Sequence, residues 1–149
     1  MNDFLEIGKA VAWKERVETV LLVEDEVFVR NVTREILQAA GYRVLSAGDS
    51  VAARRLYDEF GAEVDLLLTD MILPGENGAE LAARLRRHNP ELRVLFVTGY
   101  ADRIAILKHA GEEYLLKPFC SEALLRKVGE LMNEPTMQAE QVMRACVGV

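Results

Sequence analysis

The amino-acid sequence predicts a doubly wound α/β domain, in which helices cover both faces of a five-stranded parallel sheet. Short apolar segments alternate five times with segments of helical period, within about 115 residues. Three of the five apolar segments are continuous, which is typical of strands buried on both faces. Parallel neighbours need crossover connections, and the intervening helical segments supply them.

The five predicted strands are short apolar segments in which branched and long aliphatic side chains dominate. We place them at residues 20–23, 43–47, 64–69, 93–98 and 114–116. A helical segment follows each strand. In the first helical segment the apolar stripe ends before Gly41, a residue suited to the left-handed position after a helix. The stripe residues are Val29, Val32, Ile36, Leu37 and Ala40 in the first segment, and Ala53, Leu56, Tyr57 and Phe60 in the second.

The three later helices are predicted from start signals and apolar spacing. Asn77 can cap the third helix while the Glu80 side chain reaches back to it, which is the pattern of a capping box. The fourth helix, over residues 102–109, has few large apolar residues. We predict that Ser121 caps the fifth helix, which continues to Asn133.

Length and composition restrict the class of protein. The 149 residues leave room for one domain, over residues 19–133, with a 1–18 extension whose apolar residues would suit a helix and a 134–149 tail. The longest apolar runs have four residues, against about 20 for a bilayer span, so we expect no membrane contact. The N-terminus lacks a signal-peptide pattern, which predicts a cytoplasmic protein. A net charge of -6 without a basic patch argues against nucleic acid as a partner.

Candidate functional residues stand where four of the predicted strands end. Glu24 and Asp25 follow the first strand, Asp70 the third and Lys117 the fifth, while Thr98 ends the fourth. The carboxyl ends of strands in such a sheet open into one crevice, so these side chains can converge. Carboxylates about 4 Å apart repel by roughly 1–4 kcal/mol and therefore need a cation. Carboxylate oxygens suit Mg²⁺.

At these positions the sequence resembles the receiver domains of two-component response regulators. The resemblance covers about residues 19–133 and rests on the segments LLVEDE, LLLTDMILPGENG, VLFVTGY and YLLKPF, at the ends of four successive predicted strands. It implies a flavodoxin-like (βα)5 fold with strand order 2-1-3-4-5. It also implies a cis peptide bond before Pro118.

The resemblance implies a phosphorylation switch. Asp70 matches the nucleophile that takes a phosphoryl group from a phosphohistidine. Glu24, Asp25, Asp70 and the carbonyl of Ile72 match the Mg²⁺ ligands, and Lys117 matches the lysine that pairs with the phosphoryl oxygens. The implied partners are a sensor histidine kinase or phosphotransfer protein and a downstream protein target, with a homodimer as a further expectation.

Thr98 and Tyr114 match the switch pair of the family. On phosphorylation the Thr98 hydroxyl would bind a phosphoryl oxygen and Tyr114 would turn inward, which couples the site to an output face on the fourth helix, fifth strand and fifth helix. Ile72 and Tyr100 are bulky at positions that influence the access of water, so we expect slow self-dephosphorylation.

Three alternatives differ in class from a working switch. A degenerate receiver would only bind proteins, but Asp25, Asp70, Thr98 and Lys117 are all present. A Mg²⁺-dependent aspartyl phosphatase would carry an aspartate-x-aspartate loop, and a flavin-binding protein would carry a phosphate loop after the first strand. This sequence has neither pattern. A receiver of this kind can be a stand-alone regulator, a relay intermediate or a piece of a hybrid kinase.

Overall fold

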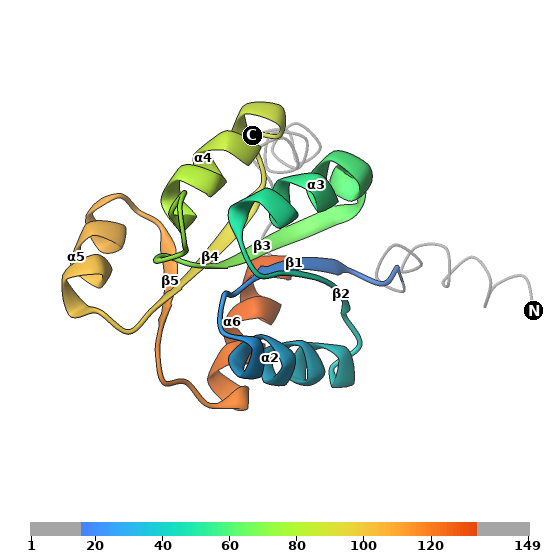
Figure 1. Ribbon diagram of the computed structural model, residues 1–149. Coiled ribbons are helices and arrows are strands. Elements are labelled where there is room, and N and C mark those ends of the chain that lie inside the picture. Colours follow the sequence, from blue (N-terminus) through green and yellow to red (C-terminus); the bar gives the residue numbers. More distant parts are fainter. Residues whose placement is uncertain (1–15, 134–149) are drawn as a thin grey trace, which may run out of the picture.

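A computed structural model of the protein describes residues 16–133 as a five-stranded parallel sheet between two helical layers (Figure 1). The strand order is β2-β1-β3-β4-β5, as the resemblance implies. Each neighbouring pair is parallel. The strands are β1 (Thr19–Val23), β2 (Arg43–Ala47), β3 (Val64–Asp70), β4 (Arg93–Thr98) and β5 (Glu113–Leu116).

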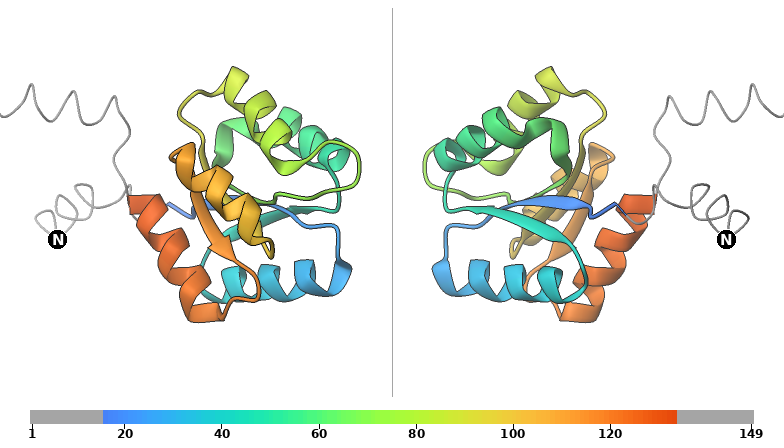
Figure 2. Two further views of the ribbon diagram at one scale, coloured as in Figure 1. Left: turned by 90° about the vertical axis from the view of Figure 1, so that its left-hand side faces the viewer. Right: turned by 90° about the vertical axis from the view of Figure 1, so that its right-hand side faces the viewer.

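Within residues 16–133, five α-helices connect or follow the strands. They are α2 (Val27–Ala39), α3 (Ser50–Phe60), α4 (Gly78–His88), α5 (Ala101–His109) and α6 (Ser121–Asn133), and a short 3-10 helix, η1 (Gly61–Glu63), precedes β3. Helices α2 and α6 cover one face of the sheet, while α3, α4 and α5 cover the other (Figures 1 and 2). The predicted doubly wound α/β class is therefore confirmed.

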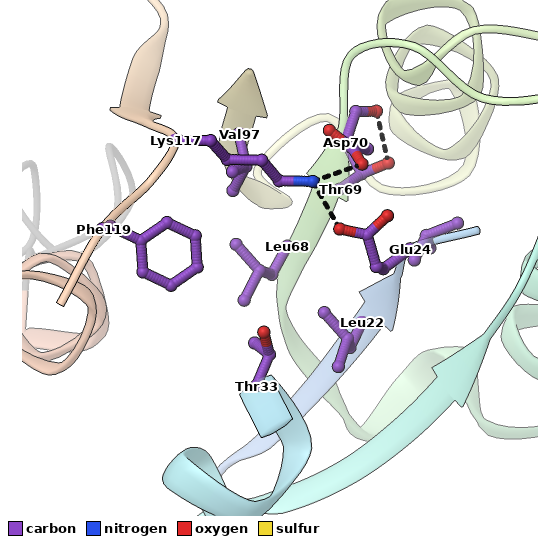
Figure 3. Close-up of a pocket in the computed structure, with 10 residues that line it drawn as sticks. Leu22, Glu24, Thr33, Leu68, Thr69, Asp70, Val97, Lys117 and Phe119 are labelled. Atoms are coloured by element: carbon purple, nitrogen blue, oxygen red, sulfur yellow. Dashed lines mark hydrogen bonds and ion pairs between the residues drawn. The ribbon is translucent and has the colours of Figure 1, made fainter. Parts of the chain in front are cut away.

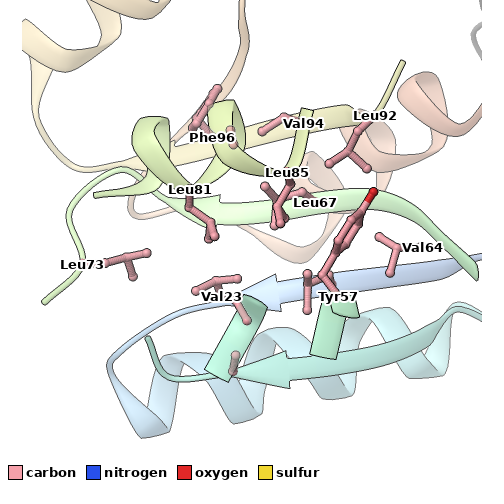
Figure 4. Packing of buried hydrophobic residues seen from close by; sticks show 14 of the residues in the cluster. Val23, Tyr57, Val64, Leu67, Leu73, Leu81, Leu85, Leu92, Val94 and Phe96 are labelled. Carbon is pink, nitrogen blue, oxygen red and sulfur yellow. The ribbon is translucent and has the colours of Figure 1, made fainter. Parts of the chain in front are cut away.

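The three central strands are buried because helices cover both of their faces. All five residues of β1 are buried. In β3 successive side chains alternate between the two layers, as the pleat of a strand requires. Leu67 packs under α3 and α4 with Tyr57, Leu81 and Leu85 (Figure 4), while Leu66 packs in the layer of α2 and α6.

Local signals set two of the helix ends that the sequence predicts. Gly41 has φ +98 after α2, as predicted. The capping box at α4 is present, with the Glu80 backbone N–H donating to the Asn77 side chain at 2.8 Å and the Asn77 N–H donating to the Glu80 carboxylate at 3.4 Å. Both signals depend on residues within one turn of the helix, which is why the sequence predicts them.

The predicted cap of the last helix is wrong by one residue. Ser121 is the first residue of α6, and Cys120 stands before it. The Ala123 backbone N–H donates to the Cys120 sulfur at 3.4 Å, and the Leu124 N–H donates to the Cys120 carbonyl oxygen at 3.1 Å. The sulfur thus takes the position in which a cap hydroxyl was expected.

Two other predictions concern the ends of the chain and the membrane. The expected N-terminal helix and C-terminal tail lie almost entirely outside residues 16–133, which are the residues that the structure describes. Within that range, no helix combines the length and the apolar character that a bilayer crossing requires.

Candidate functional site

Three carboxylates meet at the carboxyl edge of the central strands. Glu24, Asp25 and Asp70 each offer an oxygen atom, and these atoms lie within 4.8 Å of one another. The register explains why Glu24 and Asp70 meet, since each is the next residue after the paired Val23 and Thr69 of β1 and β3. Figure 3 shows the Glu24 and Asp70 carboxylates side by side at this edge.

The ammonium group of Lys117 contacts two of these carboxylates. Its Nζ donates to Oδ2 of Asp70 at 2.8 Å and also to Oε1 of Glu24 (Figure 3). The backbone N–H of Lys117 donates to the Thr98 carbonyl oxygen at 2.8 Å, which ties the end of β5 to the end of β4. The Lys117–Pro118 peptide bond is cis, as the resemblance implies.

Burial and neighbouring charges shift the pKa values of Glu24 and Asp70 in opposite directions. The side chains of Glu24 and Asp70 are 6% and 11% exposed, whereas Asp25 is exposed. Burial and the neighbouring Glu24 carboxylate raise the pKa of Asp70 to about 7. Burial also raises the pKa of Glu24, but the hydrogen bonds with Asp70 and Lys117 outweigh it and leave that pKa below its usual range.

Lys117 remains charged in this surrounding. Burial lowers the pKa of the Lys117 amine, but its contacts with Asp70 and Glu24 outweigh burial and raise that pKa above the usual range. Of the two carboxyl groups that contact Lys117, Asp70 consequently takes up a proton more readily than Glu24. One ammonium facing two buried carboxylates and the exposed Asp25 leaves an excess of negative charge, which suits a hard divalent cation such as Mg²⁺.

The loop after Asp70 is held close to the site by a glycine that sequence reasoning overlooked. Gly78, in the first turn of α4, donates its N–H to the Met71 carbonyl oxygen at 2.9 Å. A Cβ at Gly78 would lie 2.0 Å from the Asp70 carbonyl oxygen, so only glycine allows this approach. Glycine within a helix is an unfavourable choice, which is the signal that could have identified it.

The expected switch residues lie on the two strands beside the carboxylates. Thr98 ends β4, is 2% exposed, and its hydroxyl oxygen accepts the Tyr100 backbone N–H at 3.2 Å. Tyr114 on β5 is half-buried and packs against the core under α3, α4 and α5. Ile72 follows Asp70 by two residues, and its side chain is 45% exposed.

The fold and this site together define a flavodoxin-like α/β domain with an acidic group and a lysine at the carboxyl edge of its sheet. Residues 20–129 match the family model described as the response regulator receiver domain, and the chain belongs to this family. Receiver domains are phosphoacceptor signalling modules of two-component systems, generally not enzymes, and they bind Mg²⁺ at an acidic pocket.

Three relatives illustrate the range of proteins that contain such domains. The chain is 38% identical over 119 residues to the sensor kinase CckA of Brucella abortus, covering 78% of this chain but 13% of the kinase. It is 32% identical over 117 residues to the aerobic respiration control protein ArcA of Escherichia coli K12, covering 76% of this chain and 48% of ArcA.

The third relative is a solved structure. The response regulator protein TrrA of Thermotoga maritima, in complex with Mg(2+)-BeF, is 28% identical with a TM-score of 0.69, covering 77% of this chain and 99% of TrrA. This chain therefore matches 99% of the TrrA chain but less than half the length of the curated relatives above.

Proposed function

We propose that this chain is a phosphoacceptor switch in which Asp70 takes a phosphoryl group from a phosphohistidine of a sensor histidine kinase or phosphotransfer protein. The observation that carries the proposal is the contact of Lys117 with both Asp70 and Glu24 beside the exposed Asp25. The set is complete, so it supports a working switch over a degenerate receiver that only binds proteins. We assign Mg²⁺ to Glu24, Asp25, Asp70 and the carbonyl of Ile72.

The proposed reaction is a direct transfer between two nucleophiles. An Asp70 carboxylate oxygen forms a bond to phosphorus, while the bond between phosphorus and the histidine nitrogen breaks and that nitrogen keeps the electron pair. Lys117 is placed to follow the transferred group, since its Nζ already contacts Asp70. Mg²⁺ bound at the three carboxylates would offset the charge of the phosphoryl oxygens. The TrrA complex with Mg(2+)-BeF supports this assignment.

The proposed output is a change of protein contacts. Thr98 stands at the end of β4, and Tyr114 lies on the neighbouring strand β5, where it packs against the core. In this proposal Tyr114 couples the site to the face formed by α5, β5 and α6. We propose that a downstream protein reads this face. A homodimer, a cytoplasmic location and the absence of nucleic-acid binding remain predictions.

We also propose that the phosphorylated form is long-lived. The side chains of Ile72 and Tyr100 are large, apolar or aromatic, and 45% and 58% exposed. Each stands two residues beyond a residue of the proposed site, Asp70 or Thr98. Bulk at these positions hinders the water that would attack the acyl phosphate.

Intact-mass spectrometry after incubation with acetyl phosphate tests the proposal. We expect a single phosphoryl adduct that requires Mg²⁺ and that Asp70→Asn abolishes. Asp58→Asn, which changes an exposed carboxylate on α3, is the matched control and should retain the adduct. A folded protein that gives no adduct with acetyl phosphate or with donor kinases would be a degenerate receiver. Steady turnover of small phosphoesters would instead indicate the aspartyl phosphatase.

A further inference from the structure

We propose that Arg30 is a positioning residue for the metal site, and that the glycine at position 48 is required to let its guanidinium group reach the backbone beneath the acidic pair. This inference rests on the proposed function, because it concerns the Mg²⁺ ligands named above. Neither residue belongs to the set of groups that contact the phosphoryl group or the metal in that proposal.

The backbone of Glu24 is held from both sides. Its N–H donates to the Ala47 carbonyl oxygen at the end of β2 at 3.0 Å. Its carbonyl oxygen accepts a hydrogen bond from Nη1 of Arg30 at 2.8 Å. That carbonyl belongs to the peptide group that joins Glu24 to Asp25, so Arg30 sets the orientation of the peptide from which the exposed metal ligand starts.

Arg30 can reach this carbonyl because the chain turns back on itself. Arg30 lies in the first turn of α2, where its own N–H donates to the Glu26 carbonyl oxygen at 2.9 Å. The side chain returns toward the end of β1. The same turn is closed by the Glu26 N–H, which donates to the Glu24 carboxylate at 3.3 Å. Arg30 thus links the start of α2 to the acidic pair that directly follows β1.

Gly48 leaves the space that the guanidinium group occupies. A Cβ at position 48 would lie 2.8 Å from Nη1 of Arg30, and the three atoms nearest to it all belong to the Arg30 guanidinium. The φ angle of Gly48 is not positive, so an alanine fits the backbone there. The substitution Gly48→Ala would therefore displace the Arg30 side chain without changing any charge.

The positioning role of Arg30 and its positive charge predict opposite changes in Mg²⁺ affinity when Arg30 is replaced, which makes the proposal testable. If Arg30 acted only through its charge, its removal would lower the repulsion of a cation and tighten Mg²⁺ binding. If Arg30 positions the Glu24–Asp25 peptide, its removal weakens Mg²⁺ binding. Groups that hold metal ligands in place typically contribute about 10-fold to 100-fold in affinity.

The experiment is calorimetric titration of the full chain with Mg²⁺. We expect Arg30→Met and Gly48→Ala each to weaken Mg²⁺ binding by about 10-fold. The double variant should be no weaker than Arg30→Met alone, because both changes remove the same hydrogen bond. Arg34→Met, one turn further along α2, removes the same charge from the same helix and should leave Mg²⁺ affinity within about twofold of the unaltered chain.

Other results would overturn the proposal. Unchanged or tighter Mg²⁺ binding in Arg30→Met would show that the residue does not position the ligands. Additive effects in the double variant would show that Gly48 does not act through Arg30. Thermal melting in chelator checks that each variant is folded, and Gly48→Ala still tests the proposal if Arg30→Met does not fold. Asp25→Asn distinguishes failure of the proposed metal site from failure of the positioning role of Arg30. Unchanged Mg²⁺ affinity in that variant would refute the metal site itself.

Discussion

At the scale of single residues, the site is a balance of like charges against one ammonium group. Glu24 and Asp70 are buried beside each other, and Lys117 contacts both. The raised pKa of Asp70 means that ionising this carboxyl in the folded, metal-free protein costs free energy. The proposed phosphotransfer needs the ionised form of Asp70, so in this proposal a group suited to react is kept at a cost in stability.

Replacing Asp70 should therefore stabilise the metal-free protein in a pH-dependent way. The folded state binds the Asp70 proton up to about pH 7, whereas an unfolded chain releases it near 3.8. Stability is consequently lost as the pH rises between these values, and the full penalty acts above pH 7. We expect Asp70→Asn to raise the free energy of unfolding by on the order of a few kcal/mol at pH 8 and by little at pH 4.

Chemical denaturation in chelator at several pH values measures this difference. Asp58→Asn, on the exposed surface of α3, should follow the pH profile of the unaltered protein. If Asp70→Asn raised the free energy of unfolding equally at pH 4 and pH 8, the cost of ionising a buried carboxyl group could not be the cause of the increase.

A second prediction at this scale concerns the side chains of Ile72 and Tyr100. Replacing Ile72 or Tyr100 by alanine should shorten the lifetime of the acyl phosphate severalfold, since water then reaches the phosphorus more easily. The loss of radioactive phosphate from the purified phosphorylated protein measures the lifetime. The control is Ile106→Ala on α5, because Ile106 is 55% exposed and so lies between Ile72 and Tyr100 in exposure. Equal lifetimes in all variants would exclude steric control of hydrolysis by these two residues.

At the scale of elements, the site depends on how strand ends meet helix starts. The parallel pairing of β1 with β3 brings Glu24 next to Asp70, and the start of α4 packs against the Asp70 backbone. The Thr69 hydroxyl donates to the same Asp70 carbonyl oxygen at 3.0 Å. Asp70 is thus held by contacts of its backbone as well as by the contact of its side chain with Lys117.

Two glycine-to-alanine substitutions in helices should have opposite effects on stability. In Gly78→Ala the new methyl group meets the Asp70 carbonyl oxygen. We therefore expect the free energy of unfolding to fall by at least about 1–3 kcal/mol and the yield of the phosphoryl adduct to decrease. In Gly129→Ala, at a position in the middle of α6, the methyl group meets no atom within 4 Å. We therefore expect the free energy of unfolding to rise by about 0.5–1 kcal/mol. Denaturant titration measures both. A harmless Gly78→Ala would disprove the close approach of α4 to Asp70.

At the scale of the whole molecule, the sheet connects the candidate site to the edge strand β5. Strands β4 and β5 carry Thr98 and Tyr114, and their register pairs Thr98 with Leu116 and Tyr114 with Phe96. Phe96 is fully buried in the same cluster that Tyr114 packs against. If Thr98 moves toward a phosphoryl group as we propose, the movement can reach Tyr114 on β5 through this short segment of core.

Binding of a phosphoryl analogue should change the surroundings of Tyr114 only when the Thr98 hydroxyl is present. We expect Mg²⁺ with beryllofluoride to shift the ring resonances of Tyr114 in the unaltered protein and in Thr98→Ser. Thr98→Val, which keeps the shape without the hydroxyl, should lose the shift. Nuclear magnetic resonance of tyrosine-labelled protein measures it, and an undiminished shift in Thr98→Val would refute the coupling.

Much of the fold is readable from local sequence because burial and capping are local properties. Continuous apolar segments predict β1 and β3 to within one residue at each end, and Asn77 with Glu80 predicts the start of α4. The cap of α6 fails because a serine next to a helix start is a statistical preference, whereas here the Cys120 sulfur accepts the free N–H.

The sequence by itself determined the class of fold, the order of its elements and the residue types that gather at the strand ends. Only the tertiary structure decided that Lys117 contacts Glu24, 93 residues away, and that Gly48 makes room for Arg30 and Gly78 for the Asp70 backbone. The physical reason is range. Periodicity and capping act within a few residues, while such contacts exist only once every strand and helix has packed against the others.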